Sequence, residues 1–221
     1  MRRNNAEDAQ RLRGELLDAA MQLFAQGGME AVSMRAVAAQ VGVSAMAPYR
    51  YFTDKAELLS GLWQFVVRAL QEQMVAAIAA AHGGRARQRA SIETFLGYWE
   101  THPDHYHLVY MSGTPAQRAG YSKLGEAPVY AEMLKLVHGV TTDLAQELGV
   151  DTTHAKLAGD IRFAMLLGYL QGMLANQRYP WSERAVLRAA YIEQVMAAVE
   201  RCLVHGPLQA GPHGDDGIVP R

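Results

Sequence analysis

The stretch that decides the fold is VSMRAVAAQVGVSAMAPYRYF, residues 32–52. It predicts two short helices on either side of a tight Val-Gly-Val turn. Ser33 and Ser44 precede the two helices, and each can cap the free backbone N–H groups at a helix start. Gly42 suits the turn because glycine adopts positive φ without a Cβ penalty. Helices this short need support from their neighbours, so the stretch predicts a helix-turn-helix packed on a longer helix.

The second short helix is expected to point small, polar and aromatic side chains outward. Such a face fits the major groove of DNA, which is about 12 Å wide. Arg35 is expected to reach a phosphate or the O6 and N7 edge of a guanine, and Met46 to meet a thymine methyl group. Lys55 lies near the start of the next helix, whose free N–H groups attract a phosphate. The candidates for DNA contact are Arg35, Ser44, Ala45, Met46, Ala47, Tyr49, Arg50, Tyr51 and Lys55.

An ordinary helical bundle is the alternative interpretation of the same stretch. It would place Tyr49 and Tyr51 in the core rather than on the surface, whereas Phe52 is expected in the core under either interpretation. The two interpretations are distinguished by Ala45, Met46 and Tyr49. Exposure of these side chains allows DNA binding, and burial of all three would exclude it.

The rest of the chain also predicts helices, because apolar residues recur at helical spacing and the alternation typical of strands is nearly absent. We therefore expect an all-α protein of about nine helices, with Gly27-Gly28 ending the first. The predicted helices are approximately 6–26, 34–40, 45–51, 54–81, 87–101, 104–111, 129–148, 153–176 and 183–205. Residues 112–128 predict a loop. The expected domains are a helix-turn-helix domain over residues 1–60, a second helical domain over 61–205 and a disordered tail over 206–221.

Composition limits the class of protein. Half of the 221 residues are hydrophobic, which is enough for a substantial core, and Cys202 is the only cysteine, which excludes a disulfide framework. The start of the chain shows no secretory signal, and no window approaches the roughly 20 apolar residues of a membrane span. A cytoplasmic protein without membrane contact is expected. The formal net charge is −1, so the case for DNA binding depends on where side chains lie and not on bulk charge.

Motifs of enzymes and metal sites are missing from the sequence. There is no phosphate-binding glycine loop, no Gly-x-Ser-x-Gly elbow and no His-Glu-x-x-His helix. His102, His105 and His107 invite a metal interpretation, but His105 and His107 are two residues apart and would diverge on a helix. We therefore expect no enzymatic activity, no metal and no cofactor.

Residues 13–62 resemble the DNA-binding domain of the TetR family throughout. The resemblance is carried by Leu17-Asp18-Ala19-Ala20, Leu23-Phe24, Gly27-Gly28, Ser33-Met34-Arg35, Val37-Ala38, Val41-Gly42-Val43-Ser44, Tyr49-Arg50-Tyr51-Phe52, Lys55 and Leu58-Leu59. One departure is Pro48, where most members carry Leu, although Ala-Pro-Tyr-Arg resembles a recurrent branch of the family. A proline near the first turn of a helix removes an N–H donor at little cost in stability. We therefore expect the third helix to form despite Pro48.

The resemblance implies a ligand-responsive transcriptional regulator, most simply a repressor that a small hydrophobic or amphipathic effector releases from operator DNA. It also implies a homodimer in which the last two long helices form a four-helix bundle with their partners. Paired half-sites require a two-fold protein, while the alternative is a large monomeric core. The candidates for the ligand pocket are Trp63, Trp99, Tyr106, Tyr110, Met111, Met165, Tyr169 and Met173. A helical protein-binding adaptor without DNA binding remains the alternative function.

Overall fold

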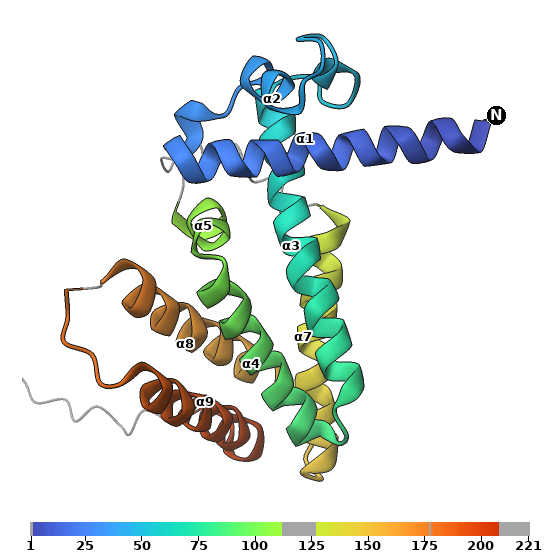
Figure 1. Ribbon diagram of the computed structural model, residues 1–221. Coiled ribbons are helices and arrows are strands. Elements are labelled where there is room, and N and C mark those ends of the chain that lie inside the picture. Colours follow the sequence, from blue (N-terminus) through green and yellow to red (C-terminus); the bar gives the residue numbers. More distant parts are fainter. Residues whose placement is uncertain (1, 112–126, 177, 208–221) are drawn as a thin grey trace, which may run out of the picture.

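The computed structural model describes residues 2–111, 127–176 and 178–207, with residues 2–6 described by their backbone alone (Figure 1). All regular structure in these ranges is helical, which confirms the predicted all-α class. The elements are α1 (Arg2–Ala31), α2 (Met34–Val41), the 3-10 helix η1 (Pro48–Arg50), α3 (Lys55–Ala80), α4 (Gly84–Thr101), α5 (Pro103–Tyr106), the π-helical turn η2 (His107–Met111), α7 (Pro128–Glu147), α8 (Ala155–Ala175) and α9 (Arg184–His205). Among these helices, none is long and apolar enough to cross a lipid bilayer.

Two glycines divide α1 into a long helix and a short final turn. Gly27 and Gly28 have non-helical backbone angles, so the regular helix ends where the sequence predicts. In Figure 1 the long part of α1 lies across the upper end of α3, and α2 lies above α1. Leu16, Val37 and Phe52 are fully buried between these elements and belong to the hydrophobic core. The first helix thus supports the helix-turn-helix, as expected.

The predicted start and end of α2 are confirmed. The Ser33 hydroxyl accepts a hydrogen bond from the Ala36 N–H at 3.1 Å, and Gly42 ends the helix in the left-handed conformation with φ of 77°. The Gly42 N–H bonds back to the carbonyls of Ala38 and Ala39. A residue with a Cβ would be strained at this turn, which is why glycine suits it.

The predicted helix over residues 45–51 is wrong. The structure has a turn followed by the three-residue 3-10 helix η1. Pro48 has no N–H and cannot donate to the Ser44 carbonyl, as an α-helix would require. The Ser44 carbonyl instead accepts from the Ala47 N–H at 2.9 Å, and the Ala47 carbonyl accepts from the Arg50 N–H at 3.1 Å. These tighter bonds between residues three apart replace the expected α-helix.

The other long helices are α3, α4, α7, α8 and α9. Figure 1 shows α3, α4 and α7 as one group, with α8 and α9 side by side next to α4. The start of α3 is capped as predicted, because the Asp54 carboxylate accepts from the Glu57 N–H at 2.8 Å. Glu57 in turn accepts from the Thr53 N–H at 2.6 Å, and this bond lowers the pKa of the Glu57 carboxyl. The long predicted helices agree with the structure within about three residues at each end, the disagreement usual between methods of assigning helix ends.

Two predicted segments differ from the structure or lie outside the described residues. The single helix expected over residues 104–111 is instead the short α5 followed by η2, which changes the hydrogen-bond pattern inside the segment. Of the predicted loop 112–128, only Ala127 and Pro128 are described, and Pro128 begins α7. Of the predicted tail 206–221, only Gly206 and Pro207 are described, and Gly206 ends α9.

Candidate DNA-binding face and ligand cavity

The segment around η1 stands outward from the helix-turn-helix. Met46 is 69% exposed and Tyr49 is 49% exposed, and Ala45 is exposed as well. This is the outcome that allows DNA binding, because burial of all three residues would have excluded it. Pro48 and Phe52 are buried beneath the segment. The buried side of the segment therefore anchors it to the domain, and the other side is exposed to solvent.

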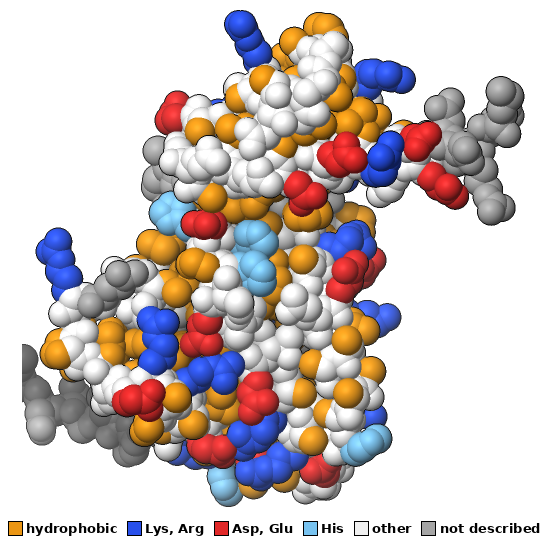
Figure 2. Space-filling view, viewed as in Figure 1, with side chains coloured by type: hydrophobic (Ala, Val, Ile, Leu, Met, Phe, Trp, Pro, Cys, Tyr) orange, Lys and Arg blue, Asp and Glu red, His pale blue; other side chains and the backbone are white. Residues whose placement is uncertain are grey.

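The remaining predicted DNA-contact residues lie on or beside the same face. Ala47 and Tyr51 are half-buried, while the other four are exposed: Arg35, Ser44, Arg50 and Lys55. Figure 2 shows this end of the molecule at the top, where basic side chains project on both sides of a surface rich in hydrophobic groups. Seven of the nine predicted residues are thus accessible, and they include cations, a hydroxyl and apolar side chains. Phosphate and base-edge contacts need these groups.

Three side-chain contacts fix this face on the rest of the domain. The Arg13 guanidinium lies 5.2 Å from the centre of the Phe52 ring, within cation–π distance. The Gln40 amide donates to the Gln22 carbonyl oxygen at 2.9 Å, which joins α2 to α1. Lys55 Nζ donates to the backbone carbonyl of Met29 at 2.7 Å. The sequence predicts Lys55 as a phosphate ligand, and the structure shows that it also bonds the turn after α1.

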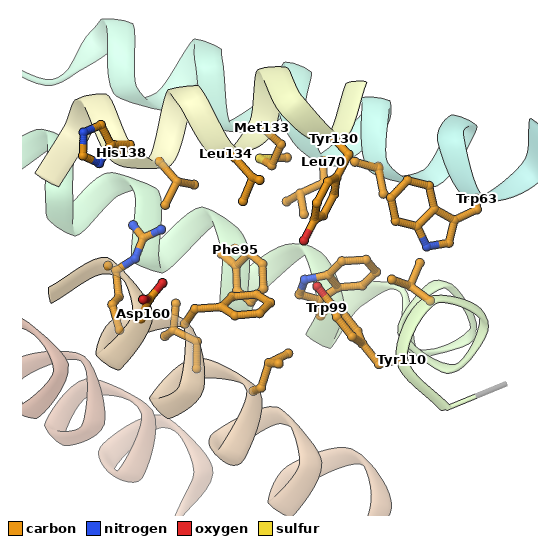
Figure 3. Close-up of a pocket in the computed structure, with 18 of the residues that line it drawn as sticks. Trp63, Leu70, Phe95, Trp99, Tyr110, Tyr130, Met133, Leu134, His138 and Asp160 are labelled. Atoms are coloured by element: carbon orange, nitrogen blue, oxygen red, sulfur yellow. The ribbon is translucent and has the colours of Figure 1, made fainter. Parts of the chain in front are cut away.

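A cavity of about 990 Å³ lies between α3, α4, η2, α7 and α8 (Figure 3). Three predicted ligand residues line it: Trp63, Trp99 and Tyr110. Its volume is at the upper end of the range for small-molecule sites. Aromatic and aliphatic side chains form most of the wall. Burial raises the pKa of the Tyr110 hydroxyl, so this group stays neutral at physiological pH.

The other five predicted ligand residues lie outside the cavity lining. Tyr106 is buried, and its ring packs against Trp99 with centres 5.9 Å apart. Tyr169 is buried near α9, where its hydroxyl donates to Glu100 at 3.1 Å. The Met165 carbonyl accepts from the Tyr191 hydroxyl at 2.7 Å. Met173 is buried and Met111 half-buried, and neither reaches the cavity. These residues pack helices together and do not face the open space.

Several lining residues could not be chosen from the sequence. The helix α7 contributes Tyr130, Met133 and His138, and α8 contributes Arg162 and Phe163. Their side chains have the same types as ordinary core or surface residues, so no local pattern singles them out. Met29 and Leu59 also line the cavity. They belong to the part of the chain that carries the helix-turn-helix, so the cavity extends to the DNA-binding domain.

The three histidines predicted not to bind a metal form a different arrangement. The rings of His102 and His105 are stacked with centres 4.9 Å apart, and His107 faces Phe24 of α1 at 5.9 Å. Within the described ranges, no three His, Cys, Asp or Glu residues could hold a metal ion together. Burial lowers the pKa of His105, and His102 lowers it further. The Tyr98 hydroxyl donates to the Val66 carbonyl at 3.1 Å and contacts His105 Nδ1 at 2.9 Å.

Residues 16–62 match the family described as "Bacterial regulatory proteins, tetR family". This segment covers the supporting helix, the helix-turn-helix and the start of α3, the part that the resemblance in the sequence indicates. These 47 of the 221 residues are thus similar to the DNA-binding domain of the TetR family. That class consists of non-enzymatic DNA-binding proteins, which agrees with the prediction that the chain is not an enzyme.

Named relatives are transcriptional regulators. The HTH-type transcriptional activator FasR of Mycolicibacterium smegmatis is 32% identical over 109 residues, which are 49% of this chain and 50% of FasR. The HTH-type transcriptional regulator AcrR of Shigella flexneri is 38% identical over 64 residues, 29% of this chain and 30% of AcrR. A TetR-like transcriptional regulator from Rhodococcus sp. RHA1 has a similar fold, with a TM-score of 0.61, 20% identity, and coverage of 87% of this chain and 95% of that one. The matched stretches thus span half or less of these two curated relatives.

Proposed function

We propose that this protein is a ligand-responsive transcriptional regulator that binds operator DNA as a homodimer. The observation that carries the proposal is the exposed segment around η1, anchored by buried Pro48 and Phe52. The single 3-10 turn inserts Met46 and Tyr49 into the major groove, and Arg35 and Arg50 flank it. We further propose a repressor that an effector releases, acting in the cytoplasm where the DNA is.

Exposed small and apolar residues on α8 and α9 support the proposed dimer. Leu157, Val186 and Val204 are between 37% and 63% exposed. Ala164 and Gly168 are also exposed on α8, and small residues let two helices approach closely. A second copy of the chain is the occupant that fits, since two half-sites about 34 Å apart require two recognition segments.

Replacing Gly168 by Arg tests the dimer without disturbing the protomer. A Cβ at Gly168 meets no atom within 4 Å, so the protomer accepts the side chain. We expect Gly168→Arg to be a folded monomer in analytical ultracentrifugation at micromolar concentration, and to lose operator binding. Gly139→Arg on α7 is the control, because its site is equally open, and it should remain a dimer. A dimeric Gly168→Arg variant would contradict the proposed interface.

The cavity lies where an effector can act on the DNA-binding domain. Leu108 and Tyr110 of η2 line it, and their neighbour His107 faces Phe24 of α1. Met29 also lines the cavity, and its backbone carbonyl accepts a hydrogen bond from Lys55. An effector that moves η2 or Met29 therefore moves the base of the DNA-binding face. Release requires that the effector binds the DNA-free arrangement more tightly than the DNA-bound one.

An electrophoretic shift assay on the DNA flanking the protein's own gene tests the function. We expect a saturable, salt-dependent shift, and reversal of that shift by compounds that raise the melting temperature in a thermal-shift screen. A promoter fusion then tests repression, which predicts increased expression when the gene is deleted. Absence of binding to any such DNA would favour the alternative, a helical adaptor for other proteins.

Lys55→Ala is expected to weaken binding of all DNA sequences alike. Removing one phosphate contact should reduce the slope of log affinity against log salt by about 0.9. The measurement is operator affinity at four or more salt concentrations, with Lys135→Ala as the control because Lys135 is exposed on α7. An unchanged slope would assign Lys55 only the hydrogen bond to Met29.

A further inference from the structure

Arg162 on α8 is a buried cation with no acidic partner among the residues that the structure describes. It lines the cavity and is 3% exposed. Its one hydrogen bond in the described part of the chain runs from Nη1 to Ser91 Oγ at 2.9 Å, and its Nε is buried with no partner. Burial lowers the pKa of Arg162 to about 10, so the guanidinium remains charged at neutral pH. A buried charge without an opposite charge is strongly unfavourable, so an anion bound beside this side chain would stabilise it.

Other charged groups of the cavity already neutralise each other. Lys156 and Asp160 both line it and form an ion pair at 2.7 Å. Figure 3 shows Asp160 and His138 at one end of the cavity and Trp63 at the opposite end. Arg162 follows Asp160 by two residues on α8, a rise of about 3 Å, so the two residues lie at the same level along the helix axis, and both line the cavity. The cavity therefore has a cationic, polar half and an apolar half.

The unpaired hydrogen-bonding atoms of the lining are both donors. Besides Arg162 Nε, the indole Nε1 of Trp99 is buried without a partner. Both residues line the cavity, and an unsatisfied buried donor is costly until an acceptor reaches it. Gln88, which is fully buried on α4 close to Ser91, has neither amide atom paired, but it does not line the cavity. Both atoms are thus buried in residues of the cavity wall, and neither has an acceptor among the described residues.

We propose that the cavity binds an amphipathic molecule with one compact anionic end group of the carboxylate type. The carboxylate oxygens accept from Arg162, and the apolar body lies along Phe95 and Trp99 towards Trp63. This assignment rests on the proposed function, in which the cavity is the effector site. It names the chemical class of that effector and the residue that selects it.

Decanoate and decanol are the probes that test the assignment, because they share a chain and differ in charge. Binding to the full-length wild-type protein is followed by tryptophan fluorescence, since two of the three tryptophans line the cavity. We expect decanoate to bind at least about tenfold more tightly than decanol, equivalent to ~1.4 kcal/mol. An uncharged cavity would show the opposite order, because burying an unpaired carboxylate is unfavourable.

Arg162→Met removes the charge and keeps the bulk of the side chain, so it should reverse the order of the two probes. Lys135→Met is the control, because it makes the same change at an exposed cation of α7 that does not line the cavity. We expect that control to change decanoate affinity by less than about twofold. If Arg162→Met fails to melt cooperatively, the wild-type comparison of decanoate with decanol decides by itself.

Two outcomes overturn the anion site. One is wild-type protein that binds decanol as tightly as decanoate or more tightly, or binds neither. The other is a folded Arg162→Met variant that keeps the wild-type preference, which would make Arg162 a purely structural residue. Operator binding is measured on the same preparations. If the protein binds operator and decanol releases it, only the proposed anion site is wrong. If the protein binds no operator, the proposed function is wrong.

Discussion

Tyr49→Glu is expected to reduce operator affinity at least about hundredfold, equivalent to ~2.7 kcal/mol. The residue is half-exposed on the segment around η1, so the substituted carboxylate would meet the phosphates and base edges of the DNA. Like charges brought together at an interface cost several kcal/mol. Since nothing is removed from the core, the melting temperature should change little. The measurement is a shift or anisotropy titration at fixed salt.

Val75→Glu is the matched control for Tyr49→Glu. Val75 is 48% exposed, close to the 49% of Tyr49, but it lies within α3 and away from η1. The substitution adds the same charge to the protein as a whole. Equal loss of affinity in both variants would mean that net charge, and not the position of Tyr49, controls binding, and the proposed recognition segment would then be wrong.

Gly84→Ala should destabilise the protein by about 3 kcal/mol, near the upper end for overpacking of a well-packed contact. Gly84 begins α4, where a Cβ would lie 2.6 Å from the Asp143 carbonyl carbon and 2.8 Å from the Leu144 Cα of α7. These are backbone atoms, so the two helices must separate. The Gly84 N–H also bonds to the Glu147 carboxylate, a contact that such a shift would break. We expect the melting temperature to fall by about 6–12 °C.

The control for Gly84→Ala is the same change at Gly139. That glycine is exposed inside α7, and a Cβ there meets no atom within 4 Å. Alanine favours helix over glycine by about 1 kcal/mol, so Gly139→Ala should raise stability slightly. Differential scanning calorimetry of both variants measures the difference. An unchanged melting temperature in Gly84→Ala would show that α4 and α7 do not pack as closely as described.

Local sequence patterns predicted the long helices and their caps well. Ser33, Gly42 and Asp54 act at helix ends through hydrogen bonds to residues at most four positions away, so the neighbouring sequence contains the whole interaction. The prediction failed at residues 45–51, where the absent N–H of Pro48 outweighs the helical pattern of its neighbours. It also missed η2, because a single π-helical turn of five residues is too short to show a periodicity of its own.

The two halves of the candidate site differ in how far the sequence could predict them. The DNA-contact candidates belong mostly to one continuous segment, and in the structure most of them are exposed. The cavity is lined by six separate elements, so its lining depends on which helix faces which. Of the eight residues chosen for it, Trp63, Trp99 and Tyr110 reach the open space. Arg162 could not have been chosen, since its isolation from acids is a property of the packed structure.

Met29 contacts both the cavity and the DNA-binding face, so effector binding and operator binding are expected to influence each other. It lines the cavity, and its carbonyl is held by a lysine of the DNA-binding face. Equilibrium binding at two linked sites obeys one coupling free energy, so the factor by which an effector weakens operator affinity must equal the factor by which operator DNA weakens effector affinity. Operator DNA therefore weakens effector binding although it makes no contact with the cavity. The coupling can then be measured by titrating either ligand in the presence and in the absence of the other.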